Sequence, residues 1–193
     1  MKVIFLDIDG VLQPYKAENR FGKDRIALRE QLSKEKGIDY SIYNEYDVAA
    51  CALDWDKKAV ERLLKIITET GAKIVVSSDW RSERLPYKVR DLLSIWDMGK
   101  YWYADTVDYD EEKMKNTIEY IKTKNPEKKY IGYRNVEILD FVFNHKDITN
   151  FVAIDDMDLS IGLENNFVHT YNVINDEQTE KCIEILTIGE FMI

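Results

Sequence analysis

The sequence predicts an α/β fold in which helices cover a mostly parallel central sheet. Strand-like and helix-like segments alternate along most of the 193-residue chain, as they do when helices connect successive parallel strands. The strand-like runs are continuously apolar, as in residues 3–6, which is typical of strands buried on both faces. No repeat and no Pro/Gly/Ser-rich linker divides the sequence, so we expect a single domain over residues 1–193.

Five short apolar runs are the expected strands. A run of this kind, bounded by polar or turn-forming residues, suits a strand in the middle of a sheet better than one at a solvent-exposed face. The runs lie at residues 2–7, 73–78, 101–107, 151–154 and 167–171.

Four segments are the expected helices of the repeating pattern, because their apolar residues recur at spacings of three and four. In the first of them, Val60, Leu63 and Ile67 fall on one face, and Gly71 is placed to end the helix. The four segments are residues 56–70, 83–96, 135–144 and 176–186.

Residues 12–53 interrupt the pattern, because a strand-to-helix connection needs only a few residues. They contain a predicted helix at about residues 24–36 and then a tyrosine-rich patch. Such tyrosines either stack on an aromatic substrate or, more commonly, pack the insertion onto the body of the domain. The patch consists of Tyr40, Tyr43 and Tyr46.

A second insertion, residues 108–130, holds an extra predicted helix that ends near Asn125 and Pro126. Ligands of open α/β sheets bind beyond the carboxyl ends of the strands. We therefore expect both insertions to act as small cap elements that shape what enters such a site.

The net charge of −9 argues against binding to long nucleic acids, which usually requires a basic surface stripe. Nucleic acid is therefore expected only as a substrate, and no feature indicates a protein partner. With His145 and His169 as the only histidines, a multi-histidine metal site is excluded.

The sequence also favours a cytoplasmic location away from membranes. No apolar run approaches the roughly 20 residues of a membrane helix. Met1 leads directly into a short strand-like run that does not resemble a signal peptide. Cys51 and Cys182 lie in separate segments, which suggests a reducing compartment and no disulfide.

Polar clusters follow three of the expected strands. They are residues 7–10 (Asp-Ile-Asp-Gly), residues 77–81 (Ser-Ser-Asp-Trp-Arg) and the pair at 155–156 (Asp-Asp). Any one of them is readily explained as a turn or a helix cap. In a parallel sheet, however, all three would meet at one edge, and carboxylates packed together must take up protons or bind a cation. An all-oxygen site suits Mg²⁺.

These clusters resemble the motifs of the haloacid-dehalogenase (HAD) superfamily of phosphatases. Residues 3–11 resemble its first motif, residues 73–78 its second and residues 152–156 its fourth. The resemblance covers nearly the whole chain apart from the two insertions. It implies a Rossmann-like three-layer α/β/α architecture. The chain is also similar to a small group of HAD domains linked to RNA repair, because it combines Ser-Ser-x-Trp-Arg at residues 77–81 with Arg-x-x-Glu-Ile at residues 134–138.

The resemblance implies a role for each motif residue. Asp7 would be the nucleophile that forms an aspartyl-phosphate, and Asp9 would be the general acid and base. Gly10 would let the backbone approach the substrate. Ser77 would donate a hydrogen bond to a phosphoryl oxygen, with Ser78 as the alternate.

The implied cofactor is Mg²⁺. Its expected ligands are the Asp7 carboxylate, the backbone carbonyl of Asp9 and Asp156, with Asp155 as a ligand or a neighbour of one. The ion would offset the repulsion between the nucleophile and the phosphate.

The third motif departs from the usual pattern, which has a lysine near the start of the helix before the fourth strand. Arg134 stands at that position and would clamp phosphate, unless it is only a solvated residue at a helix start. Lys128 and Lys129 are the fallback candidates.

Arg81 is a second candidate for contact with the substrate. The alternative is a salt bridge to Asp79 or Glu83. The remaining singular residues are expected to be structural, namely Cys51, His145, His169, Trp80 and Trp96.

The sequence thus predicts a Mg²⁺-dependent phosphomonoesterase that acts on a phosphorylated substrate. A nucleic-acid end, a nucleotide and a small phosphorylated metabolite all remain open as substrates. The alternatives are a phosphotyrosine or phosphoprotein phosphatase, a phosphotransferase that uses the same site, and a catalytically silent binding module.

Overall fold

The computed structural model describes residues 1–81, 85, 87–128 and 130–188. Its centre is a five-stranded sheet in the order β3-β2-β1-β4-β5, and the four strand pairings are all parallel. This confirms the predicted fold class. The strands are β1 (Lys2–Leu6), β2 (Lys73–Val76), β3 (Trp102–Asp105), β4 (Asn150–Asp155) and β5 (Phe167–His169).

Strand β1 is the central strand, and its register fixes where the polar clusters lie. Leu6 is paired with Val76 of β2 and with Ile154 of β4. Beyond these pairs, the Asp7 N–H donates to the Ile154 carbonyl at 3.0 Å, and the Ser77 N–H donates to the Leu6 carbonyl at 3.0 Å. The first residues of the three clusters therefore leave the sheet side by side at its carboxyl edge.

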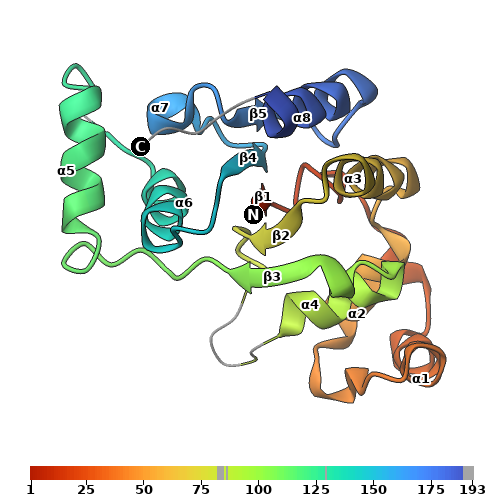
Figure 1. Cartoon of the computed structure of the whole chain (residues 1–193). Coiled ribbons are helices and arrows are strands. Elements are labelled where there is room, and N and C mark those ends of the chain that lie inside the picture. Colours follow the sequence, from red (N-terminus) through yellow and green to blue (C-terminus); the bar gives the residue numbers. More distant parts are fainter. Residues whose placement is uncertain (82–84, 86, 129, 189–193) are drawn as a thin grey trace.

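Helices cover both faces of the sheet, which gives the expected three layers (Figure 1). Alternate residues of β1 point to opposite faces, so that Ile4 and Leu6 join one core cluster while Val3 and Phe5 join the other. The first face carries α3 (Lys57–Thr70) and α8 (Asp176–Ile188), and the second carries α5 (Lys115–Lys124), α6 (Tyr133–Asn144) and α7 (Ser160–Leu163).

The best-predicted helix is α3, and its ends show why. The Asp56 side chain caps it by accepting from the Ala59 N–H at 2.8 Å. Gly71, at φ 71°, ends it in the left-handed conformation that glycine adopts readily.

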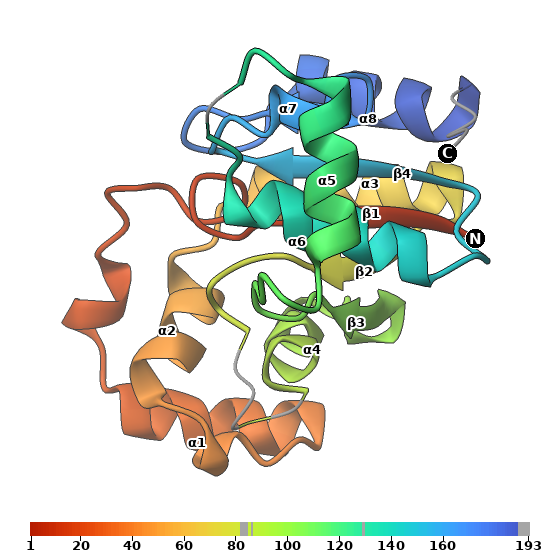
Figure 2. The same ribbon diagram turned by 90° about the vertical axis from the view of Figure 1, so that its left-hand side faces the viewer.

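The first insertion is more helical than the sequence indicated. It contains α1 (Arg25–Lys36) as expected, but also α2 (Glu45–Leu53), which was not predicted. Figure 2 shows the insertion leaving the carboxyl end of β1 and running along one side of the domain, where α1 and α2 lie near α4 (Lys88–Leu93). Short 3₁₀ helices complete this region at Asn19–Gly22, Tyr40–Ile42, Ser94–Trp96 and Gly99–Tyr101.

Two of the three patch tyrosines pack the insertion onto the body. Tyr40 and Tyr43 are buried, and their hydroxyls donate to the backbone carbonyl of Asp91 at 2.8 Å and to its carboxylate at 2.7 Å. Tyr46 is 40% exposed, but the Arg25 guanidinium lies over its ring. The packing alternative therefore holds for Tyr40 and Tyr43.

The second insertion contributes to a core rather than only to a surface. Met114, Ile118 and Ile121 belong to the core cluster on the α6 side, where α5 packs against α6 and α7. That either insertion acts as a cap over a substrate stays a prediction.

Several predicted elements differ in extent from the observed ones. The helix expected at residues 83–96 begins at Lys88 and ends as a 3₁₀ turn, while residues 82–84 and 86 lie outside the described residues. The third strand is shorter than the predicted 101–107, and it lies at one edge of the sheet, where it pairs with β2. Throughout the described ranges, none of the helices combines the length and apolar character of a membrane span.

Candidate active site

Three carboxylates from two neighbouring strands meet at the carboxyl edge of the sheet. Each of Asp7, Asp155 and Asp156 offers an oxygen that lies within 4.8 Å of those of the other two. Asp7 and Asp155 are 3% and 1% exposed, and Asp156 is half-buried. The predicted meeting of the first and fourth clusters is therefore present.

This cluster carries more negative charge than its surroundings neutralise. Burial is the main cause that raises the pKa of Asp7, to about 7, and the nearby Asp155 adds to the effect, while Arg134 and Ser78 oppose it. Burial likewise raises the pKa of Asp155, again against Arg134. One guanidinium beside three carboxylates leaves room for a further cation, and an all-oxygen donor set fits Mg²⁺.

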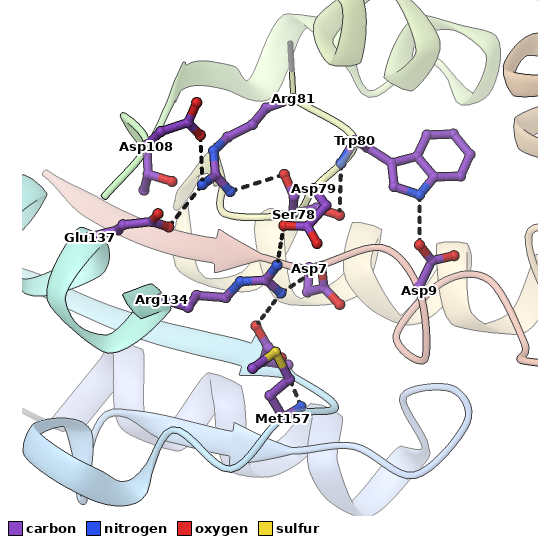
Figure 3. A network of polar contacts seen from close by, with 12 residues as sticks. Asp7, Asp9, Ser78, Asp79, Trp80, Arg81, Asp108, Arg134, Glu137 and Met157 are labelled. Carbon is purple, nitrogen blue, oxygen red and sulfur yellow. Dashed lines mark hydrogen bonds and ion pairs between the residues drawn. The ribbon is translucent and has the colours of Figure 1, made fainter. Parts of the chain in front are cut away.

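Arg134 reaches the centre of this cluster from the first turn of α6. Its Nη1 lies 3.0 Å from Asp7 Oδ1 and 3.1 Å from Asp155 Oδ2, and its Nη2 lies 2.8 Å from Asp79 Oδ1. Figure 3 shows the guanidinium between Asp7 and Asp79. The alternative of a solvated helix-start residue was wrong, since Arg134 is 9% exposed.

The helix begins at Tyr133 rather than at residue 135, which places Arg134 inside its first turn. Of the two fallback lysines, Lys128 is exposed in the preceding loop, and Lys129 lies outside the described residues. The structure thus brings Arg134, and not Lys128, to Asp7. Whether it clamps a phosphate stays a prediction.

Ser77 and Ser78 are both 1% exposed at the end of β2. The Ser78 hydroxyl lowers the pKa of Asp7 through a hydrogen bond. The Ser77 hydroxyl is buried without a hydrogen-bond partner among the residues that the structure describes. A buried hydroxyl without a partner is costly, so this position favours a ligand that accepts a hydrogen bond.

Gly10 lies against the cluster in a conformation that requires glycine. Its φ is +72°, and a Cβ atom there would lie 2.6 Å from Cβ of Asp156. The Gly10 carbonyl accepts a hydrogen bond from the Thr170 hydroxyl at 2.7 Å, which anchors the loop to the segment after β5. The backbone at Gly10 therefore lies close to Asp156, and its approach to a substrate stays a prediction.

Asp9 is exposed, and its carboxylate lies to the side of Asp7 (Figure 3). Gln13 Nε2 donates to its Oδ1 at 2.7 Å, and Trp80 Nε1 donates to its Oδ2 at 2.8 Å. The side chain is thus held in place by two donors outside the three-carboxylate cluster. Its roles as acid, base and carbonyl ligand of a metal stay predictions.

The sequence did not indicate the contacts that three aromatic residues make near the site, although Trp80 belongs to the cluster at residues 77–81. Trp80 packs against the core as expected, but it also donates to Asp9, and its ring meets that of Trp55 edge-on at 6.0 Å. The Tyr15 hydroxyl donates to Asp156 Oδ2 at 2.9 Å. The only sequence signal for Trp80 and Tyr15 was their closeness to the motifs, because their contacts depend on the folded loops.

Arg81 forms ion pairs and a hydrogen bond with other residues of the protein. Its Nη2 lies 2.8 Å from Glu137 Oε2 and 3.2 Å from Asp108 Oδ1, and its Nη1 donates to the Ser78 carbonyl at 3.0 Å. The expected kind of contact, a salt bridge, is present with other partners, since Asp79 pairs with Arg134 and Glu83 lies outside the described residues. A direct role of Arg81 in substrate binding stays a prediction.

The two histidines and the two cysteines have structural surroundings. His145 Nδ1 lies 2.7 Å from the Phe141 carbonyl, and His169 Nε2 lies 2.8 Å from the Asp156 carbonyl. Cys51 and Cys182 are buried and free. Burial raises the pKa of Cys51 well above its usual value, which makes an unreactive thiol.

Comparison with known protein families identifies a matching family. The model of a family described as "HAD domain in Swiss Army Knife RNA repair proteins" matches residues 3–174, which include all the site residues described above. Comparisons with curated proteins and with solved structures each returned no match.

Proposed function

The chain belongs to the HAD domains of Swiss Army Knife RNA repair proteins, and we propose that it is a Mg²⁺-dependent phosphomonoesterase with Asp7 as its nucleophile. Family membership supports a HAD-type hydrolase in general. One observation carries the finer proposal: Asp7 lies buried among Asp155, Asp156 and Arg134 at the carboxyl edge of the sheet, which also holds the hydroxyl of Ser77, unpartnered among the described residues. This arrangement has a carboxylate to attack phosphorus and donors to receive a phosphoryl group.

The cluster would hold Mg²⁺ through the carboxylates of Asp7 and Asp156, with Asp155 beside them and the Asp9 carbonyl as a further ligand. When bound, the ion would supply positive charge that offsets the repulsion between carboxylate and phosphate.

In the proposed reaction, an oxygen of Asp7 attacks phosphorus, and the bond from phosphorus to the leaving oxygen breaks. Arg134 orients the nucleophile from 3.0 Å and is close enough to contact a phosphoryl oxygen as well. Ser77 donates its free hydroxyl to another phosphoryl oxygen. The product is an aspartyl-phosphate, which divides one difficult displacement into two easier ones.

Asp9 moves the protons. It would protonate the leaving oxygen and then accept a proton from the water that hydrolyses the aspartyl-phosphate. Trp80 and Gln13 keep its carboxylate close beside the site through their two hydrogen bonds.

The substrate we favour is a nucleic-acid end, because the family is described by its place in RNA repair proteins. The net charge of −9 limits the contact to that end. A nucleotide, a small phosphorylated metabolite and a phosphotyrosine peptide are the other substrates to compare. Transfer of the phosphoryl group to an acceptor other than water would use the same residues.

We place the protein in the cytoplasm, on the ground that Cys51 and Cys182 are both free and buried.

The test measures phosphate release from a generic aryl phosphate with and without Mg²⁺. Asp7→Asn is expected to lower the rate by more than about 1,000-fold, as removal of a covalent nucleophile does. Asp147→Asn is the control, since this exposed residue precedes β4 at the opposite edge of the sheet. Full activity of Asp7→Asn would exclude the mechanism. Mg²⁺ binding without turnover of any phosphate ester would instead indicate a silent module.

A further inference from the structure

A cavity of about 610 Å³ lies between the start of the first insertion and the N-terminus of α3. We call it the Tyr15 cavity. The reaction proposed above assigns no role to this cavity. The lining residues that matter below are Tyr15, Lys16, Trp55 and Lys57, together with Asp54 and Asp56.

The Tyr15 cavity adjoins the reacting groups through two of its walls. Tyr15 lines it and donates its hydroxyl to Asp156. Trp55 lines it and contacts the ring of Trp80, whose indole N–H donates to Asp9. Tyr15 and the Trp55–Trp80 pair thus connect this cavity to Asp156 and to Asp9, the residue proposed to protonate the leaving oxygen.

The walls suit a planar ring with a hydrogen-bond acceptor. Tyr15 is 60% exposed, so its ring is available for contact. Trp55 is 4% exposed, yet its indole N–H has no hydrogen-bond partner in the described part of the chain. Trp55 thus brings a buried donor without a partner among the described residues to the set that lines the cavity.

The rim suits an anion. Lys16 and Lys57 line the cavity and are exposed. The carboxylates in the lining are already engaged: Asp54 pairs with Arg20 at 2.5 Å, and Asp56 caps α3. Lys57 lies 3.9 Å from Glu61 on the open surface, where such a pair is weak. Lys16 and Lys57 thus place two exposed positive charges on the rim, in a chain of net charge −9.

We propose that the Tyr15 cavity is the leaving-group subsite of the phosphatase and that it holds a nucleotide. Its base packs against Tyr15 and Trp55, and its internucleotide phosphate lies near Lys16 and Lys57. This inference rests on the proposed function. In the step it serves, the terminal phosphorus moves from the nucleotide's hydroxyl oxygen to Asp7, and that oxygen takes a proton from Asp9.

The test compares substrates that lose one group at a time. They are an adenine dinucleotide with a terminal 3′-phosphate or 5′-phosphate, the corresponding adenosine monophosphates, and ribose phosphate, which has no base. For the preferred end, kcat/KM is expected to fall about tenfold with each group removed, mainly through KM, as for a stacked base and a phosphate contact. Equal values for all these substrates would overturn the proposal.

Lysine variants test the rim. The double variant Lys16→Ala/Lys57→Ala is expected to prefer the dinucleotide less. Its ratio of kcat/KM for the dinucleotide to kcat/KM for the adenosine monophosphate should fall about tenfold. Lys58→Ala is the matched control, because Lys58 is the next residue of α3, is exposed and does not line the cavity. An equal loss of preference in Lys58→Ala would mean that bulk charge, and not this rim, selects the substrate, which overturns the proposal.

A binding measurement separates this proposal from the proposed function. Calorimetry with the unphosphorylated dinucleotide, the expected product, needs no turnover. Binding that Lys16→Ala/Lys57→Ala weakens and Lys58→Ala does not would support the subsite even if no ester were hydrolysed. Hydrolysis of an aryl phosphate with no binding of the dinucleotide would overturn the subsite and leave the phosphatase intact.

Discussion

Gly10 is the residue whose identity the site constrains most. Its φ of +72° and its closeness to Asp156 leave no space for a side chain. Gly10→Ala is expected to destabilise the fold by about 1–3 kcal/mol and to lower activity, because the new methyl must displace Asp156. Chemical denaturation and phosphate release measure the two effects.

The control for Gly10→Ala is Gly22→Ala, since an added Cβ at Gly22 meets no atom within 4 Å and its φ is not positive. No loss of stability is expected there. Equal effects of the two substitutions would show that Gly10 is not specially constrained.

Trp80 is expected to position the general acid. Trp80→Phe keeps a ring against Trp55 but removes the donor to Asp9. The rate should fall about tenfold for an alkyl phosphate, whose leaving oxygen needs a proton, and less for a dinitrophenyl phosphate, which needs none.

Trp96→Phe serves as the control for Trp80→Phe, since its indole donates to the Cys51 carbonyl instead. A purely structural role of Trp80 predicts equal losses for both esters, and that outcome would contradict its positioning role.

The sequence predicted which motif residues lie close together better than it predicted their other neighbours. Asp7 and Ser77 directly follow β1 and β2, and Asp155 ends β4, so the parallel sheet alone brings them together. Tyr15 and Trp80 lie on loops, and their contacts with Asp156 and Asp9 depend on the path that each loop takes. A sequence pattern holds little information about that path.

Between elements, a buried ion pair joins the loop after β2 to helix α6. The Arg81 and Glu137 side chains are 10% and 7% exposed and lie 2.8 Å apart. Among the described residues, Glu137→Gln leaves Arg81 with the exposed Asp108 as its charged partner. We expect it to lower the free energy of unfolding by about 2 kcal/mol, as loss of one partner of a buried pair does.

Glu61→Gln is the matched control for Glu137→Gln, because its 3.9 Å pair with Lys57 is exposed and should contribute little. Denaturant unfolding measures both variants. Equal stabilities of Glu137→Gln and the unmodified protein would mean that the Arg81–Glu137 pair does not hold α6 against the loop.

Helices with strong local signals were predicted well, and those defined by tertiary contacts were not. Helix α3 has an Asp56 cap, a regular apolar face and Gly71 at its end. Helix α2 was missed, because Val48, Ala49, Ala50 and Cys51 are all buried and show no amphipathic period. Burial on all sides removes the pattern on which such predictions depend.

For the molecule as a whole, Mg²⁺ should bind the folded state and stabilise it. Because the carboxylates come together only on folding, an ion at a hundred times its Kd adds about 2.7 kcal/mol. Mg²⁺ is therefore expected to raise Tm relative to EDTA, and Asp156→Asn should remove most of the increase. Asp147→Asn should retain it. An unchanged increase in Asp156→Asn would contradict the assignment of the metal site.

The architecture of the whole chain followed from its alternating pattern, whereas the course of the insertions did not. Strand order and layers are those that a parallel α/β sheet allows. The second insertion, expected only as a cap element, packs α5 into the core on the α6 side. The apolar residues Ile118 and Ile121 indicate that this helix buries one face, but the sequence does not show which surface they contact.

The most direct measurement locates the phosphoryl group on the protein. The protein is quenched during turnover with Mg²⁺ and an aryl phosphate, and borohydride then reduces any acyl phosphate to an alcohol that mass spectrometry can place. We predict modification at Asp7 alone, and none in Asp7→Asn. Modification of another residue, or turnover that leaves Asp7 unmodified at every quench time, would contradict Asp7 as the nucleophile.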